Sequence, residues 1–432
     1  MSKLNSACID TPVTPVQTVT RLGLTVVVVL YLAHALPLYF YNVALPAILR
    51  SQGVDLRWIG MLSLLYIPWA FKFFWAPLID RFYIQKLGRR KTWLLLTQIA
   101  LVMGILVLAW TQFDYGLTVF VMVGLWISTF AATQDIAIDG YTVEAFNESE
   151  YRLGSMAQSM GVALGSMIGG AVTLWLYQYY GWQSALTSLA VMTALTMFAI
   201  FKIQERPLTS DTTKSTDALH LNQPRPSLIL AFKRKEILWA LLLIVVYRVV
   251  EAPAMAMLNP MLIDQHWSLS QIGILMSVLG AGVGLLAAVS AAFLLKKIQA
   301  TRLLLWAGWG RTIVYALLAS AILLGWMTQW HLLLGVFVIG LLAIRYIAMT
   351  ALYAYFMHVS SKQQAGTDFT ILVCFELLVY FIGGASSGFL AKSLGYGHFY
   401  VVLSIASIIS VLLSQIIISH IQKTVHNMIS DT

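Results

Sequence analysis

Charged residues are scarce in this chain. Asp, Glu, Lys and Arg make up only 10% of its 432 residues, whereas hydrophobic residues make up 59% and the mean hydropathy is +0.80. A soluble domain carries roughly 25% charged residues. A chain this apolar cannot cover its own surface with polar side chains, so lipid must be its solvent.

Cysteines and acidic residues are also few. The two cysteines, Cys8 and Cys374, are too few for a disulfide framework, and we expect both to be free thiols. The 27 Lys and Arg outnumber the 18 Asp and Glu, which gives a net charge of +9. This excess does not indicate nucleic-acid binding, because the basic residues lie in short segments between apolar runs, where membrane topology explains them.

Motifs for several chemistries are missing. The sequence has no Gly-x-x-x-x-Gly-Lys-Ser/Thr phosphate loop, no Gly-x-Ser-x-Gly nucleophile elbow and no His, Cys, Asp or Glu group with metal-ligand spacing. We therefore expect a protein that is not an enzyme and that holds no cofactor or metal. Transport would then run on an ion gradient or by simple facilitation.

Long apolar runs, by contrast, are abundant. A spanning helix needs about 20 apolar residues, and the first run, after Arg21, is too long for a signal-peptide core. The sequence predicts an all-α integral membrane protein with twelve transmembrane helices in two six-helix bundles. The expected spans are 22–48, 57–79, 92–112, 117–141, 153–178, 183–203, 237–262, 269–295, 303–326, 331–357, 367–393 and 398–421.

A polar stretch at 204–236 divides the chain into six spans and six spans, and its end, 227–235, can form a short helix at the membrane surface. Lys and Arg concentrate at the termini, in this linker and in alternate loops, which places both termini and the linker in the cytoplasm. We expect a monomer in the cell inner membrane. The predicted parts are a segment 1–20, a bundle 21–203, a linker 204–236, a bundle 237–421 and a tail 422–432.

The two halves repeat. Residues 56–63 resemble residues 269–276, and each stretch follows a proline at similar distance, Pro46 or Pro260. Parallel repeats of six spans are the arrangement of major facilitator carriers, whose substrate site lies between the halves near the midplane.

Two acids lie one helical turn apart in the fourth span. Asp135 and Asp139 are at i and i+4, so both carboxylates lie on one helix face. Proximity and burial favour a proton on one of them, which makes both proton-coupling candidates. The alternative is a structural network in which the acids pair with Arg152, Arg81 or Lys91.

The second half has its own buried charges. Arg248 and Glu251 lie at i and i+3. They form either a neutralised structural pair, or a functional pair in which Glu251 is a proton site and Arg248 is its switch or a substrate anchor. Arg311, Arg345 and Glu376 are the other deep charges, and arginines near a cavity suggest an anionic or polyoxygenated substrate. Arg311 can instead snorkel toward the membrane surface. Glu376 is a further proton candidate and can pair with Arg311, Arg345 or Lys72.

Lys72 is the deepest cation of the first half. It lies eight residues before Asp80, about 12 Å at 1.5 Å per residue, so it either contacts substrate in a cavity or holds an acid in place. His34 is either a packing residue or a ligand and proton carrier. The remaining candidates for a substrate cavity are Tyr39, Asn42, Tyr66 and Trp69.

A tight basic loop follows Lys72 and Pro77. Residues 88–91 are Gly-Arg-Arg-Lys, and the next span begins immediately afterwards. This loop sets topology and, with the preceding acid, predicts a cytoplasmic gate. The gate residues are Asp80, Arg81, Gly88, Arg89 and Arg90.

Three segments together resemble the AmpG-like branch of the major facilitator superfamily: residues 72–81, residues 88–95 with Gln98, and residues 132–139. The branch includes muropeptide permeases, acetyl-CoA carriers and inner-membrane siderophore permeases. Within it, residues 44–53, the Asp139-Gly140 pair and the glycine spacing over 161–170 are more similar to siderophore permeases of the rhizobactin and pyochelin importing type.

The resemblance implies alternating-access import of a ferric siderophore from periplasm to cytoplasm, with protons as coupling ions. A permease for anhydro-muropeptides, or a carrier of another anionic organic solute, is the alternative within the same fold. A membrane-embedded enzyme or a receptor-like sensor is the alternative from another class, and the repeat of two halves argues against it.

Overall fold

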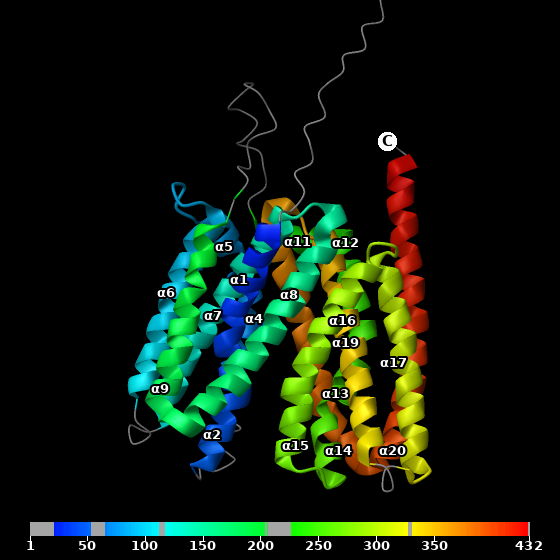
Figure 1. The fold of residues 1–432 in the computed structure, drawn as a ribbon. Helices are drawn as coiled ribbons and strands as arrows, with labels where there is room; N and C mark the ends of the chain where they lie inside the picture. The colour runs from blue at the N-terminus through cyan, green and yellow to red at the C-terminus, as the bar shows by residue number, and fades with distance from the viewer. Residues whose placement is uncertain are drawn as a thin grey trace, which may run out of the picture.

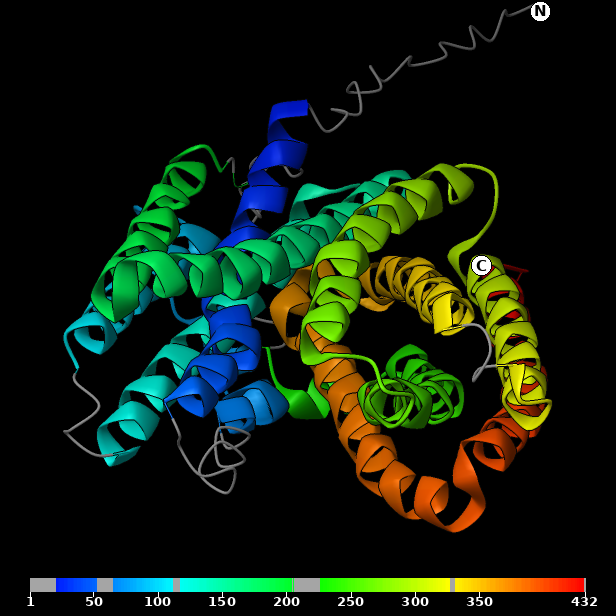
Figure 2. The same cartoon turned by 60° about the horizontal axis from the view of Figure 1, so that its bottom comes forward.

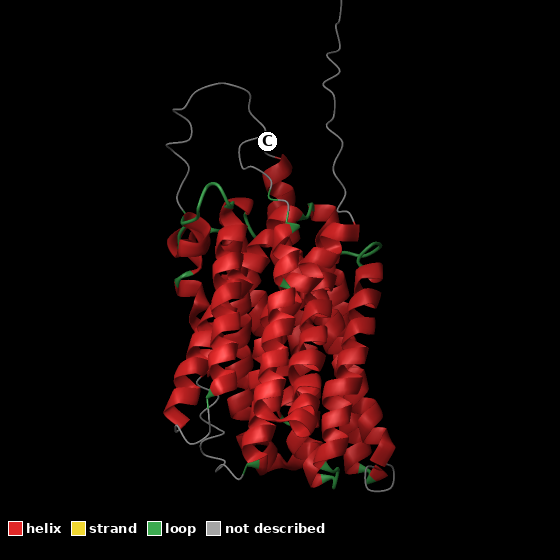
Figure 3. Ribbon diagram, turned by 60° about the vertical axis from the view of Figure 1, so that its left-hand side comes forward, coloured by secondary structure: helices red, strands yellow, loops and turns green. Residues whose placement is uncertain are grey.

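The computed structural model describes residues 21–52, 65–111, 117–203, 205, 226–326 and 331–430. Within these residues the protein is built from helices, short turns and loops, without strands (Figure 3). The segment 1–20 with Cys8, the first copy of the repeat at 56–63 and most of the linker lie outside the described residues.

The first half folds from helices that form one bundle, at the left of Figure 1. These elements are α1 (Arg21–Tyr39), η1 (Phe40–Ala44), α2 (Leu45–Ser51), α4 (Ile67–Phe71), η3 (Lys72–Phe74), α5 (Ala76–Arg81), α6 (Arg89–Trp110), α7 (Leu117–Ala145), η5 (Glu148–Glu150), α8 (Tyr151–Gly165), η6 (Ser166–Val172), α9 (Thr173–Leu195) and α10 (Met197–Phe201).

The second half forms a bundle beside the first, and the view in Figure 2 separates the two. Its elements are α11 (Leu228–Lys233), α12 (Lys235–Arg248), α13 (Glu251–Ala256), α14 (Leu258–Asp264), α15 (Leu269–Gly273), η8 (Ile274–Leu279), α16 (Gly280–Leu294), α17 (Ala300–Leu323), α19 (His331–Val359), η9 (Lys362–Gln364) and α20 (Ala365–Ser430). The short helix expected near the end of the linker is α11, and the Ser227 hydroxyl caps it by accepting from the Leu230 amide.

Nine helices of the described part are long and apolar enough to cross a membrane, or ten if the bent pair α12 and α13–α14 is one span. The longest, Glu148–Phe201, holds two of the twelve expected spans, and the expected span 57–79 begins outside the described residues. The chain is therefore a multi-pass membrane protein with the expected helical architecture.

Two glycines at equivalent places show the internal repeat. Gly181 has φ 77° and turns the chain between the fifth and sixth spans, and Gly395 has φ 71° and turns it between the eleventh and twelfth. Only glycine adopts this conformation without strain. The continuous helices α9 and α20 therefore each contain a turn at the membrane edge.

A row of glycines on α8 and η6 lets the fifth span pack directly against α1. A Cβ atom at Gly161 would meet the Val28 carbonyl, and one at Gly169 would meet the Leu36 carbonyl. Small residues at a spacing of four allow such close approach of membrane helices. The glycine spacing over 161–170 is therefore explained by helix packing.

We call the side on which α1 begins and α20 ends the terminal side (Figure 1). One hydrophobic core there is shared by both bundles and includes Tyr31 and Phe146 of the first and Phe356 and Phe369 of the second. Toward the opposite side each bundle has a core of its own. The bundles are thus held together most firmly at the terminal side.

Candidate functional site

A buried charge cluster lies inside the first bundle. The Lys72 ammonium donates to Asp135 Oδ2, and His34 Nε2 lies 3.3 Å from Asp135 Oδ1. Lys72 is only 1% exposed, and its Nζ also lies 5.3 Å from the centre of the Trp69 ring. Three predicted site residues from η3, α1 and α7 therefore meet at one carboxylate.

A break in the second span directs Lys72 inward. Pro77 has no backbone N–H to donate one turn back, so the helix is interrupted there. The 3₁₀ turn η3 separates α4 from α5, and the chain around it buries Lys72 while Phe71 and Phe74 are exposed on the outer surface. The break near Pro77 thus also sets the direction of the lysine side chain.

Asp139 lies one turn along α7 from Asp135 and has different partners. Its Oδ1 accepts hydrogen bonds from the Tyr31 hydroxyl at 2.8 Å and from Gln158 Nε2 at 3.3 Å. Its Oδ2 has no hydrogen-bond partner among the described residues, no described cation pairs with it, and its side chain is fully buried. Burying a carboxylate without a cation is costly, so this position favours a carboxyl group that holds a proton.

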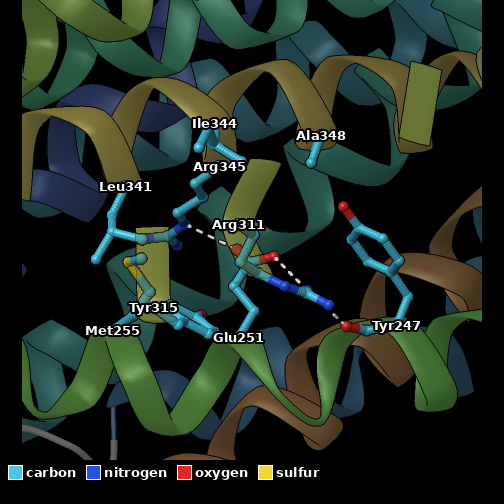
Figure 4. Close-up of a pocket in the computed structure, with 9 residues that line it drawn as sticks. All are labelled: Tyr247, Glu251, Met255, Arg311, Tyr315, Leu341, Ile344, Arg345 and Ala348. Carbon is cyan, nitrogen blue, oxygen red and sulfur yellow. Dashed lines mark hydrogen bonds and ion pairs between the residues drawn. The ribbon is translucent and has the colours of Figure 1, made fainter. Parts of the chain in front are cut away.

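A second cluster lies inside the second bundle. Arg248 Nη1 lies 2.5 Å from Glu251 Oε1, and its Nη2 donates to Glu376 Oε1. Arg311 and Arg345 also approach Glu251, at 3.9 Å and 3.6 Å (Figure 4). Three guanidinium groups therefore surround two carboxylates, which leaves this cluster with one formal positive charge in excess.

The three arginines differ in how far their charges are satisfied. Arg311 is buried and bonds the Tyr247 carbonyl at 2.9 Å and the Ser407 hydroxyl at 3.2 Å. Arg345 keeps 33% of its side chain exposed, approaches Glu251 only at 3.6 Å and lies 5.2 Å from the centre of the Tyr380 ring. Arg345 is therefore the guanidinium of this cluster with free capacity for an anion.

Arg345 lines a small cavity in the second bundle. The cavity is about 10 Å³, and Figure 4 shows Arg345 and Arg311 directed at Glu251 within it. The Tyr315 hydroxyl also lines it and has no hydrogen-bond partner among the described residues. Carboxylate, phosphate or sugar hydroxyl groups could bind to such a lining.

The two clusters face each other across the junction of the bundles. Tyr353 on α19 lies within electrostatic range of Arg248 in one cluster and of Asp139 in the other. Cys374, two residues before Glu376 on α20, is a buried free thiol that donates to the Trp69 carbonyl at 3.4 Å. With a proton on Asp139, Lys72 and Asp135 balance each other. A solute between the bundles would then lie between a neutral cluster and a cluster with one positive charge in excess.

The predicted gate residues form a latch at the terminal side. Asp80 accepts from the Thr367 amide at 2.8 Å and from its hydroxyl at 2.6 Å, and it pairs with Arg90 at 2.8 Å and Arg89 at 3.0 Å. Arg90 also pairs with Glu144 at 2.5 Å. Because Thr367 belongs to the second bundle, these contacts join the two halves.

Two of the predicted gate residues have other surroundings. Arg81 is exposed, lies 5.1 Å from the centre of the Phe82 ring and has no ion pair within the described part of the chain. Gly88, with φ 101°, turns the loop and lies against the Glu205 carboxylate. Glu205 in turn accepts from the Arg90 and Lys91 amides at 3.0 Å and 2.6 Å and caps α6.

The latch stabilises the ionised form of Asp80. Burial alone would raise the pKa of this carboxyl group, but the Arg90 and Arg89 guanidinium groups and the Thr367 hydrogen bonds bring the pKa below its usual value. The latch therefore contains a charged carboxylate at neutral pH.

The other end of the linker also contacts residues next to the latch. Arg234, just before α12, pairs with Asp368 at 2.5 Å, and Asp368 follows Thr367 directly. The Ser227 amide donates to Gln364 Oε1 at 3.1 Å. Both ends of the linker therefore bond to elements of the latch.

The three remaining cavity candidates, Tyr39, Asn42 and Tyr66, lie farther from the terminal side than the two clusters. Tyr39 lies within electrostatic range of Arg345, and the Tyr66 ring lies 6.2 Å from the Phe381 ring of the other bundle. Asn42 is exposed and lies in the π-helical segment η1. These three residues border the junction of the bundles and do not contact Lys72 or Asp135.

Several of the expected pairings of charges differ from those in the structure. Asp135 pairs with Lys72, and among the described residues neither acid of the fourth span pairs with Arg152, Arg81 or Lys91. Glu376 pairs with Arg248. The sequence analysis also missed Tyr31, Glu144, Glu205 and Thr367. Their only signal was a place one turn from a predicted site residue or at the end of a span.

The described residues hold no group of three His, Cys, Asp or Glu side chains arranged for a metal ion. The polar groups are instead engaged in ion pairs and hydrogen bonds between helices. The arrangement provides two buried charge clusters, one of which has a positive charge in excess, and a latch between the bundles. These parts are suited to binding and moving a charged solute.

Comparisons with known proteins agree with this architecture. The family model described as Major Facilitator Superfamily matches residues 27–341. The anhydromuropeptide permease of Escherichia coli K12 is 27% identical over 382 residues, which cover 87% of this chain and 75% of that protein. A putative transporter AmpG 2 of Rickettsia typhi is 21% identical and covers 88% of this chain and 91% of its own.

Solved structures show the same fold. The proton:xylose symporter XylE aligns with a TM-score of 0.70 at 12% identity, covering 90% of this chain and 94% of that one. The transporter FucP in its outward conformation aligns with a TM-score of 0.65 at 11% identity, covering 91% and 98%. At these identities the likeness concerns the fold alone.

Proposed function

Since the chain belongs to the major facilitator superfamily, whose members are transporters and not enzymes, we propose that it is a secondary active transporter that imports an anhydromuropeptide by alternating access, driven by protons. The terminal side faces the cytoplasm in this proposal, because the basic loops lie there. The latch is then a cytoplasmic gate, described in its closed state.

The substrate class rests on two supports. The relatives that match most of this chain include an anhydromuropeptide permease and a transporter named for the same branch. A solute of sugar and peptide carries carboxylates and hydroxyls, and Arg345 is the partly exposed guanidinium beside the unpartnered Tyr315 hydroxyl. Arg345 is the single observation that carries the proposal, because a bidentate guanidinium selects a carboxylate.

Two of the three features that suggested a siderophore permease have a structural explanation. The glycine spacing over 161–170 serves the contact with α1. The Arg90 guanidinium occupies the space beside Gly140 that a Cβ atom would need. Glycine at position 140 is therefore explained by the packing of the latch. The relatives named in the comparisons are AmpG-type proteins, and ferric siderophores therefore serve here as the competing substrate in the test.

The proton is assigned to Asp139. This acid is buried without a cation, whereas Asp135 pairs with Lys72, and Glu251 and Glu376 pair with Arg248. A proton that leaves Asp139 creates a buried negative charge one turn from Asp135. That charge is relieved only if Lys72 shifts or the bundles rearrange, which couples deprotonation to a conformational change.

The test is uptake into proteoliposomes that hold the purified full chain. Labelled anhydromuropeptide and labelled ferric siderophore are offered under an inward proton gradient, with and without an uncoupler. We expect accumulation of the muropeptide that the uncoupler abolishes. The Asp139→Asn variant should retain downhill exchange and lose uphill accumulation, and Arg81→Gln, an exposed charge outside the clusters, is the matched control.

Accumulation of the siderophore alone would replace the substrate assignment and keep the transport mechanism. Chemical turnover of either compound without uptake would refute the transporter itself. Normal proton-driven accumulation by Asp139→Asn would refute the assignment of the coupling proton to Asp139. Glu251→Gln would then be the next variant to measure.

A further inference from the structure

The second bundle has a position equivalent to the latch, and basic residues stand there in place of the acidic ones. The first half places Asp80 at the end of the second span, Glu144 one residue before the end of α7, and both against the bases that start α6. The second half ends its equivalent span α16 at Leu294 and continues with Lys296 and Lys297. No acid stands where Asp80 would be expected.

The positions equivalent to Glu144 and Gly366 also carry more basic residues. His358 lies one residue before the end of α19, where α7 has Glu144. Arg152 is the second residue of α8 and Gly366 the second residue of α20, and a three-residue 3₁₀ turn precedes each helix. Gly366 leaves room for the Asp80 carboxylate, whereas Arg152 brings a cation to its own site.

A hollow of about 880 Å³, open to solvent, occupies this counterpart position. It is lined from both bundles: Arg152 and Glu148 come from the first, and Lys296, Lys297 and His358 come from the second. His358, which lines the hollow, packs its ring edge-on against the Tyr151 ring, with ring centres 5.0 Å apart. Three cations therefore face one exposed carboxylate where the first latch has an internal anion.

The cations of the hollow lack carboxylate partners. In the described part of the chain, none of Arg152, Lys296 and Lys297 forms an ion pair, and Lys296 instead lies 4.7 Å from the centre of the Phe293 ring. Among the described residues, the exposed Glu148 is the one carboxylate that lines the hollow, and it forms no ion pair with any of the three cations.

We propose that this hollow is a binding site for a phosphate group, which supplies the missing anion and ties the second bundle to the first. Arg152 binds two phosphate oxygens in bidentate fashion, and Lys296 and Lys297 bind the others as point charges. The exposed side chains of Phe293 and Leu294 lie beside the hollow on the last turn of α16, where acyl chains could lie. The phosphate can therefore come from an anionic phospholipid of the inner leaflet or from solution.

The experiment measures binding, so it does not depend on the transported substrate. The purified full chain, in detergent and phosphate-free buffer, is titrated with short-chain phosphatidylglycerol, short-chain phosphatidylcholine and inorganic phosphate, and dissociation constants are read by native mass spectrometry. The test variant combines Arg152→Gln, Lys296→Gln and Lys297→Gln. The matched control combines Lys202→Gln, Lys233→Gln and Lys235→Gln, three exposed lysines outside the hollow.

We expect the test variant to weaken binding of phosphatidylglycerol about a hundred-fold, since each basic residue near a membrane surface contributes about a factor of five. The control should change it by less than about three-fold. Arg152→Gln alone should weaken it about five-fold, and this variant keeps the proposal testable if the triple variant does not fold. Phosphatidylcholine should bind the wild type more weakly than phosphatidylglycerol.

Inorganic phosphate that binds with the same dependence on Arg152 supports the site and identifies a soluble source. Binding of phosphatidylglycerol without binding of inorganic phosphate supports the site and identifies the lipid. Equal weakening in test and control variants, or no binding of either probe to the wild type, overturns the proposal.

Discussion

Substitution by asparagine should cost much more stability at Asp135 than at Asp139. Both are buried carboxyl groups on one face of α7, but only Asp135 is paired with a cation. Asp135→Asn would leave the Lys72 ammonium buried without a counter-charge, and removing one partner of a buried pair costs about 3–5 kcal/mol. Asp139→Asn replaces a neutral carboxyl group by an amide of the same shape.

The structure sets the size of the second effect. The asparagine carbonyl can still accept from the Tyr31 hydroxyl and Gln158, so at most one hydrogen bond is disturbed. The expected loss in the free energy of unfolding is about 1 kcal/mol. The two variants should therefore differ by about 2–4 kcal/mol, although the mutated atoms lie one turn apart.

The assay is reversible unfolding in mixed micelles, followed by tryptophan fluorescence. A third variant, Lys72→Met combined with Asp135→Asn, removes both charges and should be more stable than Asp135→Asn alone, because the penalty belongs to the unpaired lysine. If Asp139→Asn loses as much stability as Asp135→Asn, then Asp139 is ionised in this state. The assignment of the proton would then be refuted.

Three further variants test the packing, the latch and the anion site. Gly165→Ala should lower the free energy of unfolding by about 1–3 kcal/mol because its Cβ meets Ala35, whereas Gly388→Ala, with open space around it, should be neutral within about 1 kcal/mol; equal effects in denaturation would contradict the α1–α8 contact. Gly140→Ala should displace Arg90 and open the latch. In a background that combines Cys8→Ala and Cys374→Ala, a thiol reagent should then label Ser159→Cys about ten-fold faster; an unchanged rate would show that Arg90 does not hold the bundles together. Arg345→Gln should raise KM for the transported solute at least about ten-fold with little change in stability; an unchanged KM would remove Arg345 from the substrate site. Arg248→Gln should instead lower the free energy of unfolding by about 3–5 kcal/mol, because it leaves the buried Glu376 without its cation.

The sequence predicts the helical architecture well, because hydropathy and span length follow directly from the thickness of a bilayer. The helices Arg89–Trp110, Ala300–Leu323 and His331–Val359 lie within a few residues of the expected spans. Breaks within spans were less predictable. The π-helical segments η6 and η8 have no proline or charge to mark them, since they arise from packing against other helices.

The charged residues of the site could be named from the sequence, but most of their partners could not. A lysine eight residues inside a span must be satisfied somewhere, and this argument identifies Lys72 without its partner. Asp135 is 63 residues away, and Glu376 is 128 residues from Arg248. Such pairings depend on how helices rotate against each other, which the period of a single helix does not fix.

Each end of the linker is bonded to the latch, so these contacts hold Glu205 and Arg234 in place. Glu205 is held by the start of α6, and Arg234 is held by Asp368. A fluorescent protein inserted between residues 205 and 226 should therefore leave the contacts of the latch unchanged. The same insertion at Lys235 would break the ion pair between Arg234 and Asp368. The connection between the bundles therefore has one site that tolerates a reporter and one site that does not.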